Sequence, residues 1–456
     1  MNDLEVVVAG GGNAALCAAI TAREKGASVT LFESAPSNMR GGNTRHTRNL
    51  RASHIGPLET LEESYSEDEF WDDILKVTQG NTDEKLTHLM IKQSSSLMSW
   101  LKERDVHFQP ALSGTLSLHR TNAFFLGGGK TLLNKLYSHA EKIGVKVRYD
   151  SEITSVSISN NRAHSIDVKT ATDTTTYGIK HLIAASGGFQ SNEEWMREAW
   201  GKKADNFLIR GTPYNRGTLL KALINAGAKT VGDPTQCHAV AIDARAPKYD
   251  GGIVSRLDSV SFGIVVNQEG HRFYDEGEDF WPKRYAIWGR LVAQQPGQIA
   301  YSIVDNKVKE QFMPSIFPPI EGSSLEDLAA KLKIDPSILK ATVEQFNRAV
   351  QHGDYDSSKL DGKQTLGLSP DKTNWALTLD SPPFLAYPLK PGITFTYLGL
   401  KINERAEVLN TDDTPFDNVT AAGEIMAGNI LGEGYCAGTG MTIGGVFGRI
   451  AGNVSP

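Results

Sequence analysis

The sequence predicts an α/β fold in which two separated segments build one parallel sheet and an α+β domain is inserted between them. Three observations support this fold class: a strand, turn, helix and strand at residues 4–32, the return of that rhythm at 127–189, and a block of different texture over 232–372. After this block, "FDNVTAAGEIMAGNI" and "GGVFGRIAG" are typical of a last strand and a glycine-rich helix that rejoin the first domain. We therefore predict a first domain segment at 1–231, an inserted domain at 232–372 and a second segment at 373–456.

The opening segment predicts a βαβ unit. Leu4–Ala9 form a short apolar run, Ala14–Lys25 carry apolar residues at helical spacing, and Val29–Phe32 form a second apolar run. A strand, helix and strand in this order pair as parallel neighbours in one sheet. Helical spacing with many acidic residues then follows over about 58–106.

The inserted block predicts short strands, a charged aromatic loop "HRFYDEGEDFWPKRY" at 271–285, and two helices. The helices correspond to "SLEDLAAKLKI" and "SILKATVEQFNRAV". Ser324 and Asp327 stand at the spacing of a capping box, which predicts where the first of these helices begins.

Composition excludes several classes of function. With 40% hydrophobic and 22% charged residues, the 456-residue chain has the balance of a soluble globular enzyme. The net charge of −6 without a long basic run argues against a nucleic-acid partner or a polybasic membrane anchor. Cys17, Cys237 and Cys436 are too scattered for a disulfide framework, a metal site or an iron–sulfur cluster. No apolar run approaches the roughly 18 residues of a spanning helix, so we expect a cytoplasmic protein, with peripheral contact to a membrane partner left open.

The first glycine turn predicts a dinucleotide site. Gly10-x-Gly12-x-x-Ala15 follows a strand and opens a helix, and Glu33 ends the next strand 23 residues after Gly10. Gly10 permits the tight turn, Gly12 lets a pyrophosphate approach the backbone, and the small Ala15 lets helix and strand pack closely. The helix N-terminus then faces the phosphates and Glu33 can accept the ribose hydroxyls. This register favours a dinucleotide site over a plain glycine turn.

Further glycine-rich loops favour a flavin over a nicotinamide cofactor. "MRGGNTRHTRN" at 39–49 is too polar for a core, and "GGGKTLL" and "AASGGF" add two more close backbone approaches. A nicotinamide dinucleotide does not need so many backbone contacts, whereas the ribityl chain and ring system of FAD do.

The sequence resembles a known family over nearly its whole length. Matching pieces, in the family's order, are "VVVAGGGNAALCAAITA", "GGNT", "GGGKTLLNKLY", "LIAASGGF", "IVVNQEGHRF", "LAAKLKIDPSILKATVEQFN", "NVTAAGEIMAGN" and "VFGRIAG". They resemble the flavoprotein subunits of succinate dehydrogenase and fumarate reductase, with their 3-ketosteroid dehydrogenase relatives. The resemblance implies a Rossmann-like FAD-binding domain in two segments with an inserted capping domain.

Within this family, "RGGNTRHTRN", "RFYDEGEDFWPKRYAIWGRL" and the last glycine-rich segment are most similar to tricarballylate dehydrogenases, which oxidise a tricarboxylate to cis-aconitate with FAD.

The resemblance also implies which residues bind FAD. In the first segment these are Gly10, Gly12, Asn13, Ala14, Ala15, Glu33, Ser34, Gly41, Gly42, Asn43, Thr44, Ile153, Ser186, Gly187 and Gly188. In the last segment they are Gly423, Glu424, Gly440, Met441, Thr442 and Ile443. Family members that link FAD covalently carry a histidine about where Asn43 stands, so we expect non-covalent FAD.

On the substrate side, the family's Gln-x-His-Pro pattern matches Gln236 to His238 with Ala239 in place of the proline. His238 is thus a candidate carboxylate donor, and a structural histidine is the open alternative. The family's proton-shuttling arginine corresponds to Arg284, with Lys283 and Arg272 as competitors.

Other substrate contacts of the family have no clear counterpart here. Arg256 and Ser259 stand near the places of its supporting glutamate and arginine, and "ITFTYLG" at 393–399 lacks its substrate-binding histidine. Tyr435 stands where fumarate reductases carry an arginine. With the Gly440 backbone it resembles the carbonyl-polarising pair of ketosteroid dehydrogenases, and a core tyrosine is the alternative.

The expected reaction moves a hydride from one carbon to flavin N5 and a proton from the neighbouring carbon, which lies α to a carboxylate. Cations must stabilise the enolate-like charge, so we expect His238, Arg256 and Arg284 to bind carboxylates and Arg284 to exchange the proton. The substrate would be a small polycarboxylate, and the electron acceptor a separate iron–sulfur or membrane protein. A ketosteroid Δ1-dehydrogenase, a fumarate reductase, and an electron-transfer subunit without its own substrate remain alternatives.

Overall fold

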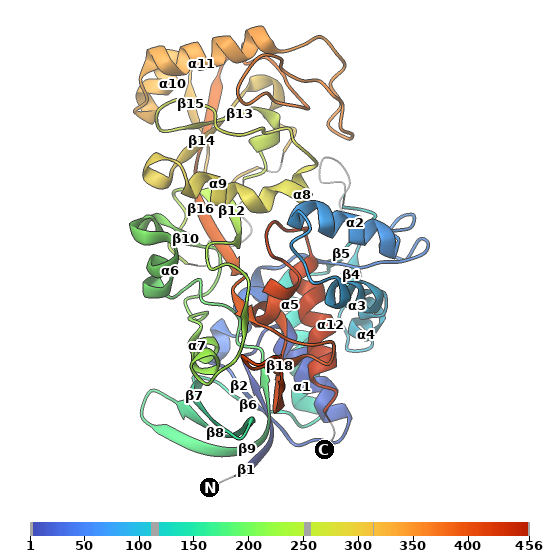
Figure 1. Cartoon of the computed structure of the whole chain (residues 1–456). Coiled ribbons are helices and arrows are strands. Elements are labelled where there is room, and N and C mark those ends of the chain that lie inside the picture. Colours follow the sequence, from blue (N-terminus) through green and yellow to red (C-terminus); the bar gives the residue numbers. More distant parts are fainter. Residues whose placement is uncertain (1–2, 111–117, 250–256, 313, 455–456) are drawn as a thin grey trace.

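The computed structural model describes residues 3–110, 118–249, 257–312 and 314–454. One end of the molecule holds a large parallel sheet with its helices, and the other end holds a second sheet with α10 and α11 (Figure 1). This is the predicted mixed α/β architecture, and it is confirmed.

The large sheet has eight strands, with the parallel order β19, β9, β1, β2, β6 at its centre. The eight strands are β1 (Asp3–Ala9), β2 (Val29–Phe32), β6 (Lys146–Arg148), β7 (Glu152–Ser159), β8 (Arg162–Lys169), β9 (Thr174–Ala184), β18 (Glu407–Leu409) and β19 (Pro415–Ala421). Because β19 pairs with β9, the last part of the chain completes a sheet that the first part begins.

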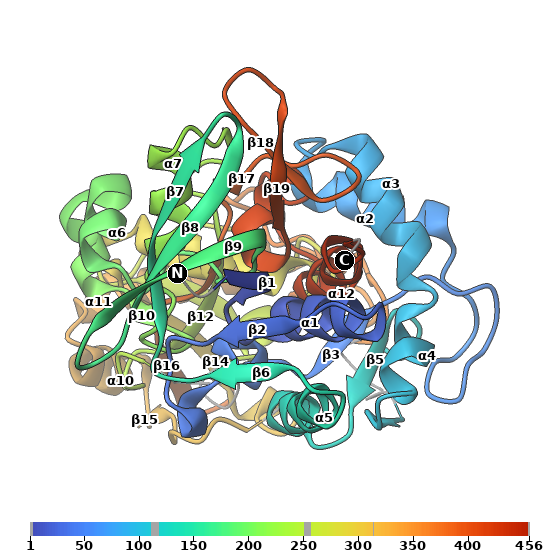
Figure 2. The same ribbon diagram turned by 90° about the horizontal axis from the view of Figure 1, so that it is seen from below.

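The first and last helices of the described chain lie side by side on this sheet (Figure 2). They are α1 (Asn13–Glu24) and α12 (Thr439–Ala451). A Cβ atom on Gly448 would lie 2.6 Å from the Ala14 carbonyl oxygen, so only glycine allows the two backbones to approach this closely. The predicted elements at residues 4–9, 14–25 and 29–32 are therefore confirmed within a residue or two.

Further helices and two small sheets, one of β3, β5 and β4 and one of β11 and β17, accompany the large sheet. The helices are α2 (Glu67–Thr78), α3 (Glu84–Ser94), α4 (Leu97–Lys102), α5 (Gly128–Lys142), α6 (Glu193–Trp200) and α7 (Thr218–Asn225). The short strands are β3 (Asn49–Arg51), β4 (Phe108–Gln109), β5 (Asn122–Phe125), β11 (Thr230–Val231) and β17 (Gly399–Leu400). The helical spacing that the sequence shows over about 58–106 corresponds to α2, α3 and α4.

The second sheet has six strands built around one long strand, β16 (Phe384–Thr396). The other strands are β10 (Leu208–Ile209), β12 (Cys237–Asp243), β13 (Ile264–Asn267), β14 (Ala300–Asp305) and β15 (Ile320–Gly322). The helices of this part are α8 (Trp281–Arg284), α9 (Trp288–Ala293), α10 (Leu325–Leu332) and α11 (Pro336–Ala349). The start of β16 pairs with β14 and β15 and its end pairs with β12, so this strand runs from the capping part to the FAD side.

The central strand of the second sheet lies after the predicted inserted block. Both β10 and β16 fall outside 232–372, although they pair with each other inside this sheet. Hydrogen bonds pair β16 with strands from the other two predicted segments, so this sheet contains strands from all three segments. The boundaries at 231/232 and 372/373 stay predictions.

The capping box of α10 forms only in half. The Ser324 hydroxyl accepts from the Asp327 backbone N–H at 3.1 Å, as predicted. The Asp327 carboxylate accepts from the Ser323 N–H at 2.9 Å instead of reaching the Ser324 N–H. No described helix is long and apolar enough to cross a membrane.

Candidate active site

A deep cleft opens at the carboxyl ends of β1 and β2, where ligands bind in open parallel sheets. It contains about 1640 Å³ of space, including open solvent at its mouth. Residues from all three predicted segments line it, because the end of β16 and the turn before α12 close its far side.

The three consecutive glycines after β1 have different reasons to be glycine. Gly10 has φ +105°, and a Cβ atom there would lie 2.4 Å from the Ala185 carbonyl oxygen. A Cβ atom on Gly11 would lie 2.1 Å from the Tyr137 hydroxyl, so both positions are fixed by the protein's own packing. A Cβ atom on Gly12 would come no closer than 3.3 Å to Thr44. Gly12 lines the cleft, and its missing side chain leaves room for a ligand at the N-terminus of α1.

Glu33 joins the end of β2 to the second glycine-rich loop. Its buried carboxylate accepts from the Ala35 N–H and from the Gly41 N–H, each at 3.0 Å. Burial raises the pKa of Glu33, while these backbone donors act in the opposite direction. The Ser34 hydroxyl also donates to this carboxylate, at 3.5 Å. Acceptance of ribose hydroxyls by Glu33 stays a prediction.

The loop at 41–46 is held against both α1 and β16. The Thr44 hydroxyl accepts from the Asn13 N–H at 3.0 Å, and the Asn13 side chain donates to the Met441 carbonyl oxygen at 3.0 Å. The Asn43 amide donates to the Thr394 carbonyl oxygen. Predicted site residues that lie far apart in the sequence therefore contact one another through hydrogen bonds.

Ser186 and Glu424 also line the cleft. The Ser186 Oγ atom is buried and has no hydrogen-bond partner among the described residues, as expected for a group that a ligand would contact. Glu424 accepts from the Thr396 N–H at 3.0 Å. Burial raises the pKa of Glu424 to about 7, although backbone N–H groups oppose this shift.

Most of the predicted FAD residues lie along the cleft. Those that line it are Gly10, Gly12, Asn13, Ala14, Glu33, Ser34, Gly41, Gly42, Asn43, Thr44, Ile153, Ser186, Gly187, Gly423, Glu424, Gly440 and Met441. Four predicted residues do not line it: Ala15, Gly188, Thr442 and Ile443. These four are buried behind the cleft surface, where they pack between elements.

The far end of the cleft is aromatic. His238 on β12 stacks on Tyr435, with ring centroids 4.0 Å apart and planes 11° apart. The Tyr435 hydroxyl oxygen accepts from the Gly440 N–H at 3.0 Å, whereas the resemblance to ketosteroid dehydrogenases implies that both groups face a substrate carbonyl. Burial raises the pKa of Tyr435. We call Trp281, Tyr285, Phe395 and Tyr435 the aromatic wall, because all four line the cleft here.

The charged loop at 271–285 satisfies its acids internally or through neighbouring residues. Glu276 pairs with Arg272 at 2.7 Å inside the protein, and Asp275 accepts from the Thr373 hydroxyl at 2.7 Å. Glu278 pairs with Arg284 at 2.5 Å, and this arginine also donates to the Tyr274 hydroxyl at 2.8 Å.

Arg284 is therefore not among the residues that line the cleft. From this loop the cleft receives Trp281 and Tyr285 instead. Lys283, the competing candidate, pairs with Asp73 at 2.6 Å. Arg256 lies outside the described residues, and the proton-shuttling role of Arg284 stays a prediction.

Arg210 is a cleft residue that the sequence analysis missed. Its side chain is only 6% exposed, lines the cleft, and donates to the Thr394 hydroxyl at 3.3 Å. Arg48 and Arg216 also line the cleft. The only local signal for Arg210 is an arginine directly after an apolar strand and before Gly211, which is too common to single out a site.

A family model described as an FAD binding domain matches residues 5–442. The chain belongs to this family. It therefore binds FAD, and the open position at Gly12 and the buried Ser186 hydroxyl fit that cofactor.

Curated relatives cover almost the whole chain. An NADH:fumarate oxidoreductase of Klebsiella pneumoniae is 27% identical over 98% of this chain and 47% of its own length. A probable fumarate reductase of Shewanella frigidimarina is 27% identical over 98% of this chain and 74% of its own length. The chain thus spans about half the length of the first relative and about three quarters of the second.

Solved structures share the fold. A flavocytochrome c3 fumarate reductase in an open conformation superposes with a TM-score of 0.76 at 23% identity, over 99% of this chain and 78% of that one. A 3-ketosteroid Δ1-dehydrogenase from Sterolibacterium denitrificans superposes with a TM-score of 0.77 at 18% identity, over 99% of each chain.

Gly12→Ala should separate cofactor binding from folding. The backbone at Gly12 allows alanine, and the added methyl group would occupy the cleft, so we expect FAD affinity to fall at least about tenfold while the fold is kept. FAD content and melting temperature measure the two effects. Gly56→Ala is the matched control, because no atom lies within 4 Å of its added Cβ and it should retain FAD. Full FAD content in Gly12→Ala would contradict the assignment.

Glu424 should make the FAD-free protein less stable as pH rises. Its carboxyl titrates near 4.5 when unfolded and about 7 when folded, so between these values the folded chain binds more protons. The free energy of unfolding then falls with rising pH, by about 3 kcal/mol at about 1.4 kcal/mol per pKa unit. Glu424→Gln should lack this loss, which denaturant unfolding at pH 4.5 and pH 8 measures. Equal pH dependence in both proteins would refute the raised pKa.

Proposed function

We propose that this chain is an FAD-dependent oxidoreductase that oxidises a CH–CH bond of a small polycarboxylate, with tricarballylate oxidised to cis-aconitate as the reaction. The observation that carries the proposal is an FAD cleft whose lining includes the buried Arg210, the partly buried Arg48 and His238. The resemblance of the charged aromatic loop to tricarballylate dehydrogenases supports the substrate.

The cleft residues suit a substrate with several carboxylates. A guanidinium binds a carboxylate with two parallel hydrogen bonds, and burial of Arg210 strengthens that attraction because little water competes. His238 can donate to a second carboxylate. The Tyr435 oxygen already accepts from Gly440, so its own O–H is oriented toward another acceptor.

Proton removal α to a carboxylate builds negative charge on that carboxylate, and fixed cations beside it lower the barrier. FAD, when bound, supplies the hydride acceptor. We keep Arg284 as the proposed proton acceptor because it follows Trp281 and precedes Tyr285, which both line the cleft. A guanidinium must lose a proton before it can accept one from the substrate, and Glu278, which pairs with Arg284, is the group proposed to take that proton.

The cofactor is proposed to be bound without a covalent link, because Asn43 stands where covalent relatives carry a histidine. Acid precipitation should then leave all FAD in solution. We also propose a separate electron acceptor, an iron–sulfur or membrane protein, and a cytoplasmic location with peripheral contact to such a partner.

A second candidate is a dehydrogenase of the ketosteroid type acting on a cyclic ketone. The hydrogen bond between Gly440 and Tyr435 and the aromatic wall favour it. Arg210 in the cleft lining favours the polycarboxylate instead, because a guanidinium binds a carboxylate with two charge-assisted hydrogen bonds, which a ketone oxygen cannot match. Fumarate reduction would use the same cations in the opposite direction.

Anaerobic bleaching of the flavin tests the proposed function. The holoprotein is mixed with tricarballylate, succinate or a 3-ketosteroid, and the absorbance of oxidised flavin is followed. We expect bleaching by tricarballylate. Bleaching by the steroid alone would support the second candidate, and no bleaching by any compound would support an electron-transfer subunit without its own substrate.

Two arginine variants divide binding from proton transfer. Arg210→Met should raise KM for tricarballylate at least about tenfold, because a buried carboxylate contact contributes about 1.5–3 kcal/mol. Arg284→Lys should lower kcat with a smaller change in KM, because the exchange of a proton is needed only during turnover. Unchanged turnover in Arg284→Lys with FAD retained would refute the proton-acceptor role, and unchanged KM in Arg210→Met would refute the carboxylate contact.

A further inference from the structure

Helix α2 contacts the loop at 279–285 through two ion pairs of opposite polarity. Asp73 on α2 pairs with Lys283 at 2.6 Å, and Lys76 on α2 pairs with Asp279. Residues three apart on a helix share one face, so Asp73 and Lys76 lie side by side on α2. They face Lys283 and Asp279 of the loop, respectively. Figure 1 shows α2 beside α8, which carries Lys283.

These two pairs bracket part of the aromatic wall. Asp279 lies two residues before Trp281, and Lys283 lies two residues before Tyr285. Both aromatic side chains line the cleft. The Trp281 indole also donates to Asp258 at 2.7 Å on the side of the capping part. The position of the wall therefore depends on where α2 holds this loop.

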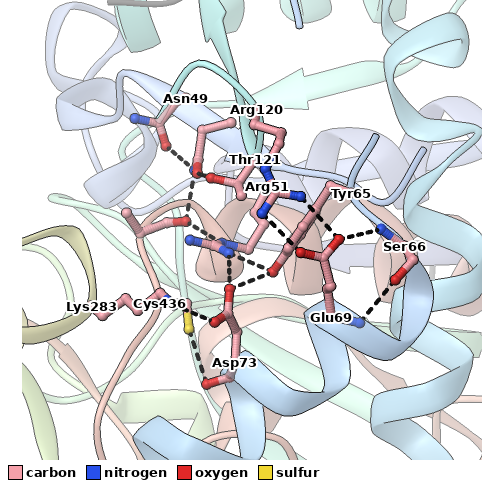
Figure 3. A network of polar contacts seen from close by, with 12 residues as sticks. Asn49, Arg51, Tyr65, Ser66, Glu69, Asp73, Arg120, Thr121, Lys283 and Cys436 are labelled. Carbon is pink, nitrogen blue, oxygen red and sulfur yellow. Dashed lines mark hydrogen bonds and ion pairs between the residues drawn. The ribbon is translucent and has the colours of Figure 1, made fainter. Parts of the chain in front are cut away.

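Asp73 is itself fixed on the FAD side (Figure 3). Its second carboxylate oxygen accepts from Arg51 at 2.9 Å and from the Tyr65 hydroxyl at 2.8 Å. Burial acts to raise the pKa of Asp73, but the charges of Arg51 and Lys283 outweigh it and hold the pKa below its ordinary value. The carboxylate thus stays ionised and connects Arg51 and Tyr65 to Lys283 of the loop.

Arg51 extends this contact to the opposite side of the cleft. Its side chain is 1% exposed, and its Nε–H donates to the Ala437 carbonyl oxygen at 3.1 Å. Ala437 lines the cleft two residues after Tyr435. The ion pair of Asp73 with Arg51 therefore connects the loop that carries Trp281 to the turn that carries Tyr435.

The exposed Lys76 is expected to stabilise the loop more than an ordinary surface lysine would. Its side chain is 57% exposed, but its partner Asp279 is only 2% exposed. An exposed ion pair contributes little, whereas a buried carboxylate that loses its cation is strongly destabilised where it lies. Without Lys76, the Asp279 side chain is expected to turn toward water and to move Trp281, two residues later, with it.

We propose that Asp73 and Lys76 are positioning residues that hold the loop at 279–285 in place, so that Trp281 and Tyr285 stand over the substrate end of the cleft. This two-point contact, Asp73–Lys283 and Lys76–Asp279, acts through the aromatic wall and does not touch the reacting atoms. Only its effect on substrate binding rests on the proposed function. The contact itself can be measured without a substrate.

Hydrogen–deuterium exchange of the holoprotein tests the contact directly. In Lys76→Met/Lys283→Met, we expect the backbone amides of residues 279–288 to exchange at least about tenfold faster, because local opening sets the exchange rate. Residues 325–349 in α10 and α11 should exchange as in the unchanged protein. Each single variant should show a smaller acceleration, and either one suffices if the double variant does not fold.

Controls separate positioning from general stability. Lys340→Met removes an exposed ion pair with Glu326 in the capping part and should leave exchange at 279–288 unchanged. Lys283→Arg keeps the charge and should restore slow exchange. Wild-type exchange at 279–288 in the double variant, or an equal acceleration in Lys340→Met, would overturn the proposal.

Turnover gives the second readout. With tricarballylate, the double variant should raise KM about tenfold, since the wall positions the substrate. It should also lower kcat, because Arg284, the proposed proton acceptor, lies in the same loop. A wild-type protein that turns over none of the tested compounds would refute the proposed function alone, because the exchange result does not depend on it. Unchanged KM in a variant with fast exchange would refute the link between wall position and substrate binding.

Discussion

The close packing of the first helix on the last one is the contact on which the rest of the structure depends. Gly448 lets the α12 backbone approach Ala14, and Asn13 joins the N-termini of both helices by donating to Met441. Both helix N-termini therefore meet at the cleft, where their partial positive charges favour an anionic cofactor and anionic substrates. Without this contact the two predicted segments of the FAD-binding unit, which residues 232–372 separate, would not share one cleft.

A second constraint comes from strand β16. Its beginning lies in the sheet of the capping part, and its end places Thr394 and Thr396 against Asn43 and Glu424 on the FAD side. One continuous strand thus carries the capping part to the cofactor. The ion pairs of α2 add a second connection, to the loop that carries Trp281.

Local chemistry made much of the fold and cofactor site predictable. The sequence identifies Gly10 as the tight turn, Gly12 as the close approach of the cofactor to the backbone, and Glu33 as the acid at the next strand end. Each role depends on residue type and short spacing. Family resemblance extended this to Ser186 and Glu424. All of these line the cleft.

The substrate end was less predictable because its geometry depends on distant partners. Arg284 has the right residue type, but Glu278 and Tyr274 hold it, and Trp281 and Tyr285 line the cleft from the same loop. Arg210 reaches the cleft through the pairing of β10 with β16, and no short-range pattern reveals this contact between residues nearly 200 positions apart. Side-chain direction in a short loop is set by tertiary ion pairs, which sequence spacing does not encode.

A crystal structure of the holoprotein with tricarballylate bound would test the central claim most directly. The account predicts the ligand inside the cleft, with one carboxylate within hydrogen-bond distance of Arg210 and its carbon chain beside the aromatic wall. A ligand whose carboxylates contact Arg284 away from the cleft, with Arg210 untouched, would contradict it.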